Sequence, residues 1–293
     1  MKQPGQLLRE IKRKRWAYFF LVPGWILFAV FTLYPVVETV RISFFNYSIR
    51  SSSFTGLSNY TRLFTDQQFR TTLKNCFQYV VILVPAIVLL ALFISAAVMN
   101  ARTKVQSFVR GAFYLPTVVG GVIISAVWLW MYHPLNGLFN HIITSFGGEP
   151  VMWLADARYA LPALCLVVVT WTVGTPIIIF MAAQLGIAPD LYEAARIDGA
   201  TQRQLYFRIT LPLMKPVIVF VVIMQIIAVF QLWEVVYLLT NGGPNYSTMS
   251  MGYLIYNTAF VSGKYGLAAA QGVVLTLVIL FFSMISMRAG RES

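Results

Sequence analysis

Aromatic, hydroxyl and amide side chains stand together within two otherwise apolar stretches of this 293-residue sequence. The first stretch contains Trp171, Thr172 and Thr175. The second contains Gln225, Val229, Leu232, Trp233 and Glu234. Aromatic rings stack on the C–H faces of a sugar, and amides and hydroxyls hydrogen-bond to its hydroxyl groups. These residue types predict a pathway that contacts a sugar, although hydrogen bonding between helices would use the same side chains.

A polar segment, 186–215, separates the two stretches and carries a second kind of chemistry. Pro189 suits the first position of a short helix, and Gly199 suits the residue that ends one. Thr201 can cap a second helix directly afterwards. The result is a helix–turn–helix with small residues near its turn, too short to fold as a domain. We expect another protein to dock on it, with Glu193 available to pair with a cation of that partner.

Nucleotide and metal chemistry have no candidate site in this sequence. The nearest approach to a phosphate-binding loop, Gly263 and Lys264, is followed by Tyr265 instead of serine or threonine. The two cysteines, Cys76 and Cys165, lie in apolar stretches without metal-ligand spacing, so buried thiols are expected. We therefore predict a protein that is not an enzyme, with no catalytic residues, no metal site and no cofactor of its own.

The elements that must hold these residues are membrane helices. Apolar residues make up 58% of the chain and charged residues 11%, which excludes a soluble enzyme, a nucleic-acid-binding module and a disordered chain. A helix must be about 20 residues long to cross a bilayer core. Six stretches are long enough, and they are 16–37, 76–99, 111–132, 159–185, 217–239 and 265–287. The predicted fold class is all-α, a polytopic membrane protein with six transmembrane helices.

The positions of the basic residues set the orientation of this bundle. With the N-terminus inside, 15 of the 22 Lys and Arg residues fall in inside segments, so both termini are predicted to be cytoplasmic. The first apolar stretch is too long for a cleaved signal and should remain as a helix. We divide the chain into a basic N-terminal segment 1–15, a transmembrane domain 16–287 and a cytoplasmic C-terminal segment 288–293.

Several short stretches carry a resemblance to a known family. EAARIDGA at 193–200, followed by ITLPLMKP at 209–216, closely resembles the EAA loop of binding-protein-dependent ABC importer permeases. NYTRLF at 59–64, WLADARYAL at 153–161 and LLTNGGP at 238–244 resemble the sugar-importer branch. The chain looks most like the first permease subunit of maltose- and glycerol-3-phosphate-type importers. It departs from the maltose subunit in having neither extra N-terminal helices nor a large periplasmic insertion.

The resemblance implies an ABC type I importer permease in a bacterial or archaeal inner membrane, moving a sugar or oligosaccharide by alternating access. Two ATPase subunits, which hold ATP and Mg, would dock on the loop 186–215. The implied coupling residues are Glu193, Ala194, Ala195, Asp198 and Gly199. The other implied partners are a second homologous permease, an extracytoplasmic solute-binding protein, the sugar and membrane lipid, with no nucleic acid.

The same resemblance places sugar contacts at positions that match Trp171, Thr175, Gln225, Val229 and Leu232. Because Val229 and Leu232 are apolar, we expect a weaker sugar site in this subunit than in its relatives. The spans contain no Lys or Arg, which favours a neutral sugar over a phosphate ester.

The alternative is an ion-coupled secondary transporter or channel in which Glu234 is the coupling group. One buried acid in six spans fits that alternative less well. We expect Gln225 to contact substrate and Glu234 to serve structure.

Overall fold

The computed structural model describes residues 15–49, 51–99 and 101–291. Most of them are helical, in agreement with the predicted all-α class. The only strands within these ranges are two short ones that pair with each other. The predicted N-terminal segment 1–15 lies outside the described residues except for Arg15, and so do residues 292–293 at the other end.

The described elements follow one another from an N-terminal helix to a long C-terminal helix. Three of them, labelled η, are π-helical segments within longer helices. In order, the elements are α2 (Arg15–Phe28), η1 (Ala29–Leu33), α3 (Tyr34–Ile42), β1 (Phe45–Tyr47), β2 (Ser52–Phe54), α4 (Ser58–Thr65), α5 (Gln67–Val98), α6 (Thr103–Val119), α7 (Gly121–Met131), α8 (Leu138–Ser145), α9 (Ala157–Thr172), α10 (Gly174–Leu185), α11 (Pro189–Ile197), α12 (Gln202–Leu205), η2 (Tyr206–Thr210), α13 (Leu211–Leu213), α14 (Lys215–Phe230), α15 (Glu234–Thr240), α16 (Met251–Tyr256), η3 (Asn257–Val261) and α17 (Tyr265–Arg291).

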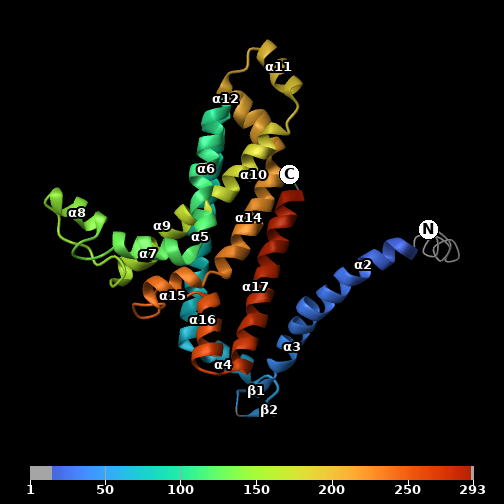
Figure 1. The fold of residues 1–293 in the computed structure, drawn as a ribbon, viewed down its shortest axis with the longest axis vertical. Helices are drawn as coiled ribbons and strands as arrows, with labels where there is room; N and C mark the ends of the chain where they lie inside the picture. Colours follow the sequence, from blue (N-terminus) through green and yellow to red (C-terminus); the bar gives the residue numbers. More distant parts are fainter. Residues whose placement is uncertain (1–14, 50, 100, 292–293) are drawn as a thin grey trace.

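The long helices α5, α14 and α17 form the centre of a bundle (Figure 1). Helices α11 and α12 lie at one end of the bundle, and β1, β2 and α4 lie at the opposite end. Two parts reach away from the bundle on opposite sides: α2, and the pair α7 and α8, which we call the α7–α8 arm (Figure 1). The predicted docking segment and the strands thus occupy opposite ends of the molecule.

The candidate membrane spans agree with the predicted stretches in place but not always in shape. Single helices cover Phe19–Ile42, Gln67–Val98 and Tyr265–Arg288. Three further pairs of helices are long and apolar enough only when both members are taken together, and each pair is bent. They are Thr103–Val119 with Gly121–Met131 (98°), Ala157–Thr172 with Gly174–Leu185 (46°), and Gln202–Leu213 with Lys215–Phe230 (65°). The predicted stretches 111–132 and 159–185 are therefore each two helices instead of one. The stretch 217–239 is also divided, between α14 and α15, whereas the 65° bend lies before it, at Met214.

The interruptions after α6, α9 and α14 each have an identifiable cause. Gly120 has a φ of +87°, a backbone conformation that favours glycine, and it separates α6 from α7. Pro176 has no N–H to donate to the carbonyl of Thr172, and α9 ends at that residue. After α14, the carbonyl of Leu232 accepts a hydrogen bond from the Ser250 hydroxyl instead of from a helical N–H. The chain can leave the helix there without stranding that polar group.

The first span is exposed over most of its length, and only residues near its end, such as Glu38, Thr39 and Ile42, are half-buried. None of its apolar core stretch is buried in this chain, and Phe20 is 78% exposed. It runs from Phe19 to Ile42, so it ends five residues later than the predicted 16–37. Pro35 lies just after the π-helical segment η1, which widens the helix where the proline ring would clash with the preceding turn. This helix needs lipid or another chain to cover it.

The core of the bundle fixes the segment between α15 and α16. The Asn75 amide of α5 donates to the carbonyl of Tyr246 at 2.6 Å, and the Tyr79 hydroxyl donates to that of Thr248 at 2.9 Å.

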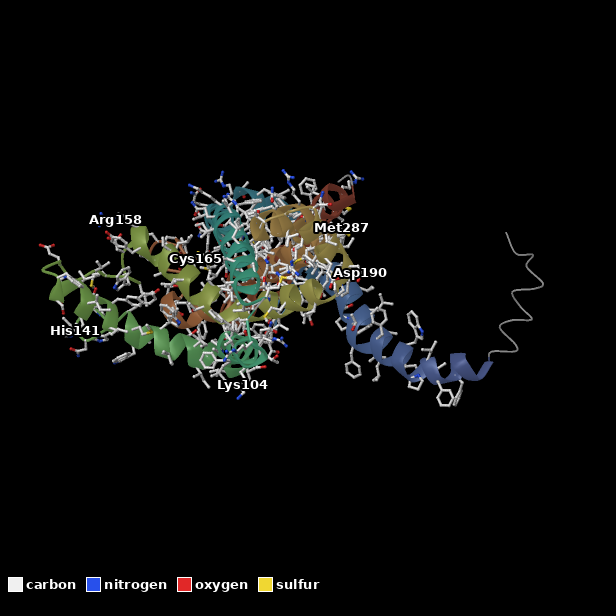
Figure 2. All side chains as sticks on the ribbon, turned by 90° about the horizontal axis from the view of Figure 1, so that it is seen from above. Lys104, His141, Arg158, Cys165, Asp190 and Met287 are labelled. Atoms are coloured by element: carbon white, nitrogen blue, oxygen red, sulfur yellow. The ribbon has the colours of Figure 1, made fainter. Side chains whose placement is uncertain are left out.

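Cys76 and Cys165 are buried and free, which confirms the prediction of buried thiols. Figure 2 shows Cys165 among the bundle helices.

Candidate functional site

A cavity of about 300 Å³ lies where α9, α14 and α15 meet. Seven of the eight predicted pathway residues line it. The lining residues are Val168, Trp171, Thr172, Gln225, Ala228, Val229, Gln231, Leu232, Trp233 and Glu234. The structure therefore brings the two polar stretches together into one site, which we call the substrate cavity after the role predicted for its residues.

Thr175 is the predicted residue that the structure leaves out of this cavity. It lies on α10, beyond the 46° bend that follows α9, and it is exposed. The bend separates it from the wall that Trp171 forms. Helix α14 ends at Phe230, so the helical spacing that begins at Gln225 does not continue to Val236, which is fully buried.

Several polar groups of the cavity lack partners within the described part of the chain. The Trp171 indole N–H is buried and has no hydrogen-bond partner there. The side chains of Gln225 and Glu234 likewise make no hydrogen bond or ion pair with another described residue. By contrast, the Thr172 hydroxyl donates to the carbonyl of Val168 at 2.8 Å. Since buried polar groups are usually paired, an unpaired donor and amide are suited to a ligand rich in hydroxyl groups.

Gly121 allows three helices to pack closely together beside the cavity. A Cβ at this position would lie 2.8 Å from Glu234 Cδ and 2.9 Å from a ring carbon of Trp171. The Thr117 hydroxyl of α6 donates to the Trp171 carbonyl at 2.8 Å, which holds α6 against the end of α9. The close approach of α7, α9 and α15 therefore requires a residue without a side chain.

Trp233 is held as a platform by neighbouring rings. Its ring stacks on Tyr256 with centroids 5.1 Å apart and on Tyr237 with centroids 6.4 Å apart. The side chain remains 41% exposed while it lines the cavity. An ordered, partly exposed ring is the arrangement that stacking on a sugar needs.

The sequence analysis missed some members of this site. Val168 and Ala228 line the cavity as ordinary apolar residues, so nothing in their type distinguishes them from core or lipid-facing positions. Gly121 had a usable signal, because two consecutive glycines inside an apolar stretch indicate a break or a close approach.

The predicted docking segment forms the two short helices that the sequence indicated. Helix α11 begins at Pro189, and Gly199 follows it with a φ of +80°. The N–H of Ala200 donates to Ala195 O at 2.9 Å, which closes the glycine stop that ends the helix. Thr201 and Gln204 form a reciprocal capping box at the start of α12.

The predicted coupling residues lie on the outside of this segment. Glu193, Ala194, Asp198 and Gly199 are exposed and Ala195 is half-buried. Nearby, Ile197 is 87% exposed, an unusual exposure for a large apolar side chain on a polar segment. The Tyr192 hydroxyl lies 2.9 Å from the Thr210 hydroxyl, which ties α11 to the start of the next span. This contact connects α11 to the bundle.

Replacing Gly199 by valine tests whether this turn matters. A Cβ at this position meets no atom within 4 Å, so the expected damage comes from the backbone φ of +80° alone. That conformation costs a residue other than glycine on the order of 1–2 kcal/mol. If the chain transports a sugar, as the sequence resemblance implies, uptake should fall several-fold in Gly199→Val. Gly199→Asn tolerates positive φ and should stay near the wild-type rate. Equal rates for the two variants would contradict the turn's importance.

A comparison with known protein families finds a match over most of the chain. Residues 69–289 match the model of the family described as the binding-protein-dependent transport system inner membrane component. This stretch contains the substrate cavity and the docking segment, and it leaves out the exposed first span.

Individual relatives match nearly end to end. The chain is 32% identical over 281 residues to the lactose transport system permease protein of Rhizobium radiobacter, covering 94% of each chain. It is 31% identical over 286 residues to the trehalose/maltose transport system permease protein of Thermococcus litoralis, covering 96% of each. A solved bacterial alginate ABC transporter, in complex with an alginate pentasaccharide-bound periplasmic protein, has a chain that superposes with a TM-score of 0.84. It is 25% identical, with 98% of each chain covered.

Proposed function

The chain belongs to the binding-protein-dependent transport system inner membrane component family, and we propose that it is a permease subunit that moves a neutral sugar or oligosaccharide into the cell. The predicted resemblance to sugar ABC importer permeases is confirmed by its relatives. Family membership favours this function over the ion-coupled alternative. The observation that carries the proposal is the substrate cavity, with its two indole rings and unpaired amide.

A neutral sugar suits this cavity better than an anionic one. Glu234 lines the cavity, and within the described part of the chain no Lys or Arg does. An unpaired carboxylate would repel a carboxylate, sulfonate or phosphate on the substrate at short range. Trp171 and Trp233 supply stacking surfaces, and Gln225 and Gln231 supply both donors and acceptors.

Alternating access would use the bent spans. We infer that six spans cross the membrane, each bent pair counting as one, with both termini and the docking segment in the cytoplasm. The substrate cavity lies beside the ends of α9 and α14, so a change in these bends would alter its openings. The α11–α12 end would respond to the ATPase subunits and the opposite end to the solute-binding protein.

The partners follow from the same arrangement. Two ATPase subunits, which hold ATP and Mg, would dock on 186–215, and a second homologous permease would complete the pathway. The exposed apolar side chains of the first span and of the α7–α8 arm, with Phe146 88% exposed, support burial against lipid or that second permease. The complex would lie in a bacterial or archaeal inner membrane.

Replacing Gln225 by leucine tests the substrate cavity. We expect transport at limiting sugar to fall about fivefold, because one sugar hydroxyl loses a partner worth about 1 kcal/mol. Assembly and basal ATPase activity of the complex should persist. The measurement is uptake of labelled sugar into proteoliposomes that contain the full complex.

Two further variants control this experiment. Met224→Leu changes the neighbouring residue of α14, which is 50% exposed and lies outside the cavity, and it should leave uptake unchanged. Glu234→Gln keeps the shape of the side chain and should allow uptake of the neutral sugar, in line with its predicted structural role. If Gln225→Leu transports every tested sugar at the wild-type rate, the cavity is not the sugar pathway.

A further inference from the structure

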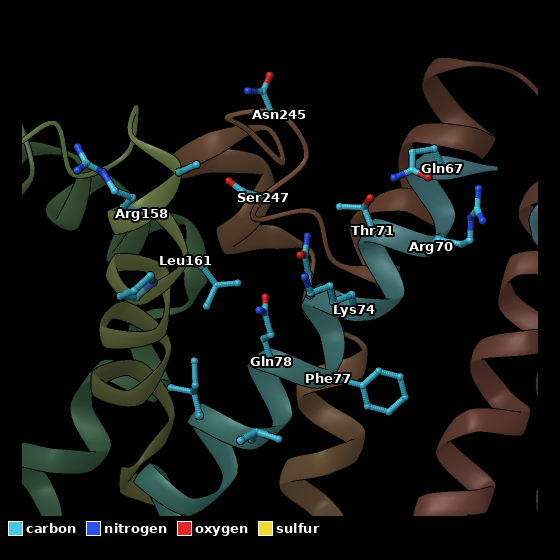
Figure 3. A pocket seen from close by; sticks show the side chains of 15 residues that line it. Gln67, Arg70, Thr71, Lys74, Phe77, Gln78, Arg158, Leu161, Asn245 and Ser247 are labelled. Carbon is cyan, nitrogen blue, oxygen red and sulfur yellow. The ribbon is translucent and has the colours of Figure 1, made fainter.

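A second and larger cavity, of about 1020 Å³, lies between α5, α9 and the segment 245–247. It shares no lining residue with the substrate cavity, and we call it the α5–α9 groove. Figure 3 shows Lys74 and Gln78 extending from α5 into the space between the helices, Leu161 of α9 facing them, and Ser247 beside the groove. The groove lies toward the end of the bundle opposite the docking segment.

One end of the groove carries an excess of positive charge. Arg70, Lys74 and Arg158 line it, and among the described residues no acidic side chain does. Lys74 is exposed, and its ammonium makes no hydrogen bond or ion pair with another described residue. The Arg70 guanidinium has only a long hydrogen bond, 3.4 Å, to the carbonyl of Thr65. These two cations are free to bind an anion.

The two acids near the groove are already engaged. Asp156 pairs with Arg158 at 2.6 Å, and this hydrogen-bonded guanidinium holds the pKa of the Asp156 carboxyl below its usual range. Asp66 caps α5, where it accepts a hydrogen bond from the N–H of Gln68 at 2.7 Å. Neither carboxylate neutralises Lys74.

The other end of the groove is apolar and open. It is lined by Val81 and Ile82 of α5 and by Leu161 and Pro162 of α9. Val81 is 71% exposed and Ile82 is 42% exposed. Lys74 and Ile82 are eight residues apart, which corresponds to about 12 Å along the helix axis. The lining of the groove thus changes from cationic to apolar over about 12 Å. This is roughly the distance between the phosphate of a phospholipid and the part of its acyl chains nearest the headgroup.

Ser247 adds a hydrogen-bonding group at the cationic end. Its hydroxyl is buried and has no partner among the described residues. The bond from the Asn75 amide to Tyr246 O holds the neighbouring backbone in place. A phosphate or glycerol oxygen of a bound molecule would satisfy this hydroxyl.

We propose that the α5–α9 groove binds one anionic phospholipid, with its phosphate at Lys74 and Arg70 and an acyl chain along Val81, Ile82 and Leu161. A free phosphate would occupy only the cationic end and leave the apolar end empty. A phosphatidylcholine would carry its own cation toward Lys74, so the groove should prefer a net negative headgroup. The bound lipid would link α5 and α9, two walls of the bundle. This proposal does not depend on the identity of the transported sugar.

Native mass spectrometry of the purified full-length chain tests the proposal. The probes are phosphatidylglycerol and phosphatidylcholine with identical acyl chains. Each cation beside the phosphate should contribute about fivefold in affinity, so we expect phosphatidylglycerol to be retained about 25-fold more tightly. The variant Arg70→Gln/Lys74→Gln should lose this preference. Equal retention of the two lipids by the wild-type chain would overturn the proposal.

A matched variant separates the groove from general surface charge. Arg62→Gln/Lys264→Gln removes the same charge from exposed positions outside the groove and should keep the preference. Loss of preference in this control, or its survival in Arg70→Gln/Lys74→Gln, would contradict a specific site. Soluble glycerophosphoglycerol, which is the headgroup without acyl chains, tests whether the acyl chain contributes to binding. If it binds the chain as tightly as phosphatidylglycerol does, the proposed acyl-chain contact is wrong. The helical content measured by circular dichroism verifies that each variant is folded. Sugar uptake is measured separately, so that a failure of the lipid-binding proposal can be distinguished from a failure of the proposed transport function.

Discussion

Replacing Gly174 by alanine is expected to destabilise the bundle strongly, although alanine is the better helix former. A Cβ at this position would lie 2.7 Å from Phe113 C and 2.8 Å from Tyr114 Cα, and closer still to the carbonyl oxygen of Phe113. These are backbone atoms of α6, so no side chain can rotate away. Either α10 or α6 must move, and such overpacking costs typically about 1–3 kcal/mol. The thermal midpoint of the purified chain should fall by about 5–10 °C.

Gly272 provides the matched control for this experiment. It lies within α17, and a Cβ there meets no atom within 4 Å. Gly272→Ala should be neutral or slightly stabilising, since alanine in a helix gains roughly 0.5–1 kcal/mol over glycine. Equal thermal midpoints for Gly174→Ala and Gly272→Ala would show that α6 and α10 do not cross as closely as described.

Backbone contacts such as that of Gly174 with α6 show which parts of the fold could be predicted from the sequence and which could not. Hydropathy located the six apolar stretches because transfer into lipid depends on side-chain type. It did not locate the ends of the helices, because a break depends on backbone contacts. The interruption after Phe230 rests on a bond from Ser250, which lies twenty residues further along the chain. Pro176 marked the break after α9, whereas Gly120 was counted as part of a span.

The two functional regions differed in how much the sequence could establish. The docking segment was predictable in structure because its signals are local: Pro189 begins a helix, Gly199 ends it and Thr201 caps the next. The substrate cavity was predictable only as a set of polar residues in apolar surroundings. Thr175 shared that property and was misplaced, since its position depends on a bend. The apolar wall residue Val168 could not be found at all.

Replacing Glu193 by alanine is expected to reduce sugar uptake by the reconstituted transporter tenfold or more. Glu193 is exposed on α11, and its carboxylate has no ion pair or hydrogen bond with the other described residues. We therefore expect it to bind a cation on the ATPase subunit. A charge-assisted hydrogen bond of that kind contributes about 1.5–3 kcal/mol, which corresponds to roughly tenfold to a hundredfold in an equilibrium.

The position of Glu193 makes the expected defect one of coupling. It lines a groove of about 400 Å³ with Tyr192, whose hydroxyl contacts Thr210 at the start of the following span. A partner that grips Glu193 can thus move α11 and, through Tyr192, the bundle. The sugar affinity of the solute-binding protein should not change, because we propose that this protein acts at the opposite end of the bundle.

Measuring ATPase stimulation and uptake in the same proteoliposomes distinguishes coupling from assembly. Glu193→Ala should lose both stimulation and uptake while the permease itself stays folded, and Glu193→Gln should retain part of each because it can still accept a hydrogen bond. Asp190→Ala removes a charge from the first turn of the same helix and should cost only about 0.3–1 kcal/mol of helix stability. If Asp190→Ala and Glu193→Ala impair uptake equally, loss of helix stability explains both and the coupling role of Glu193 is wrong.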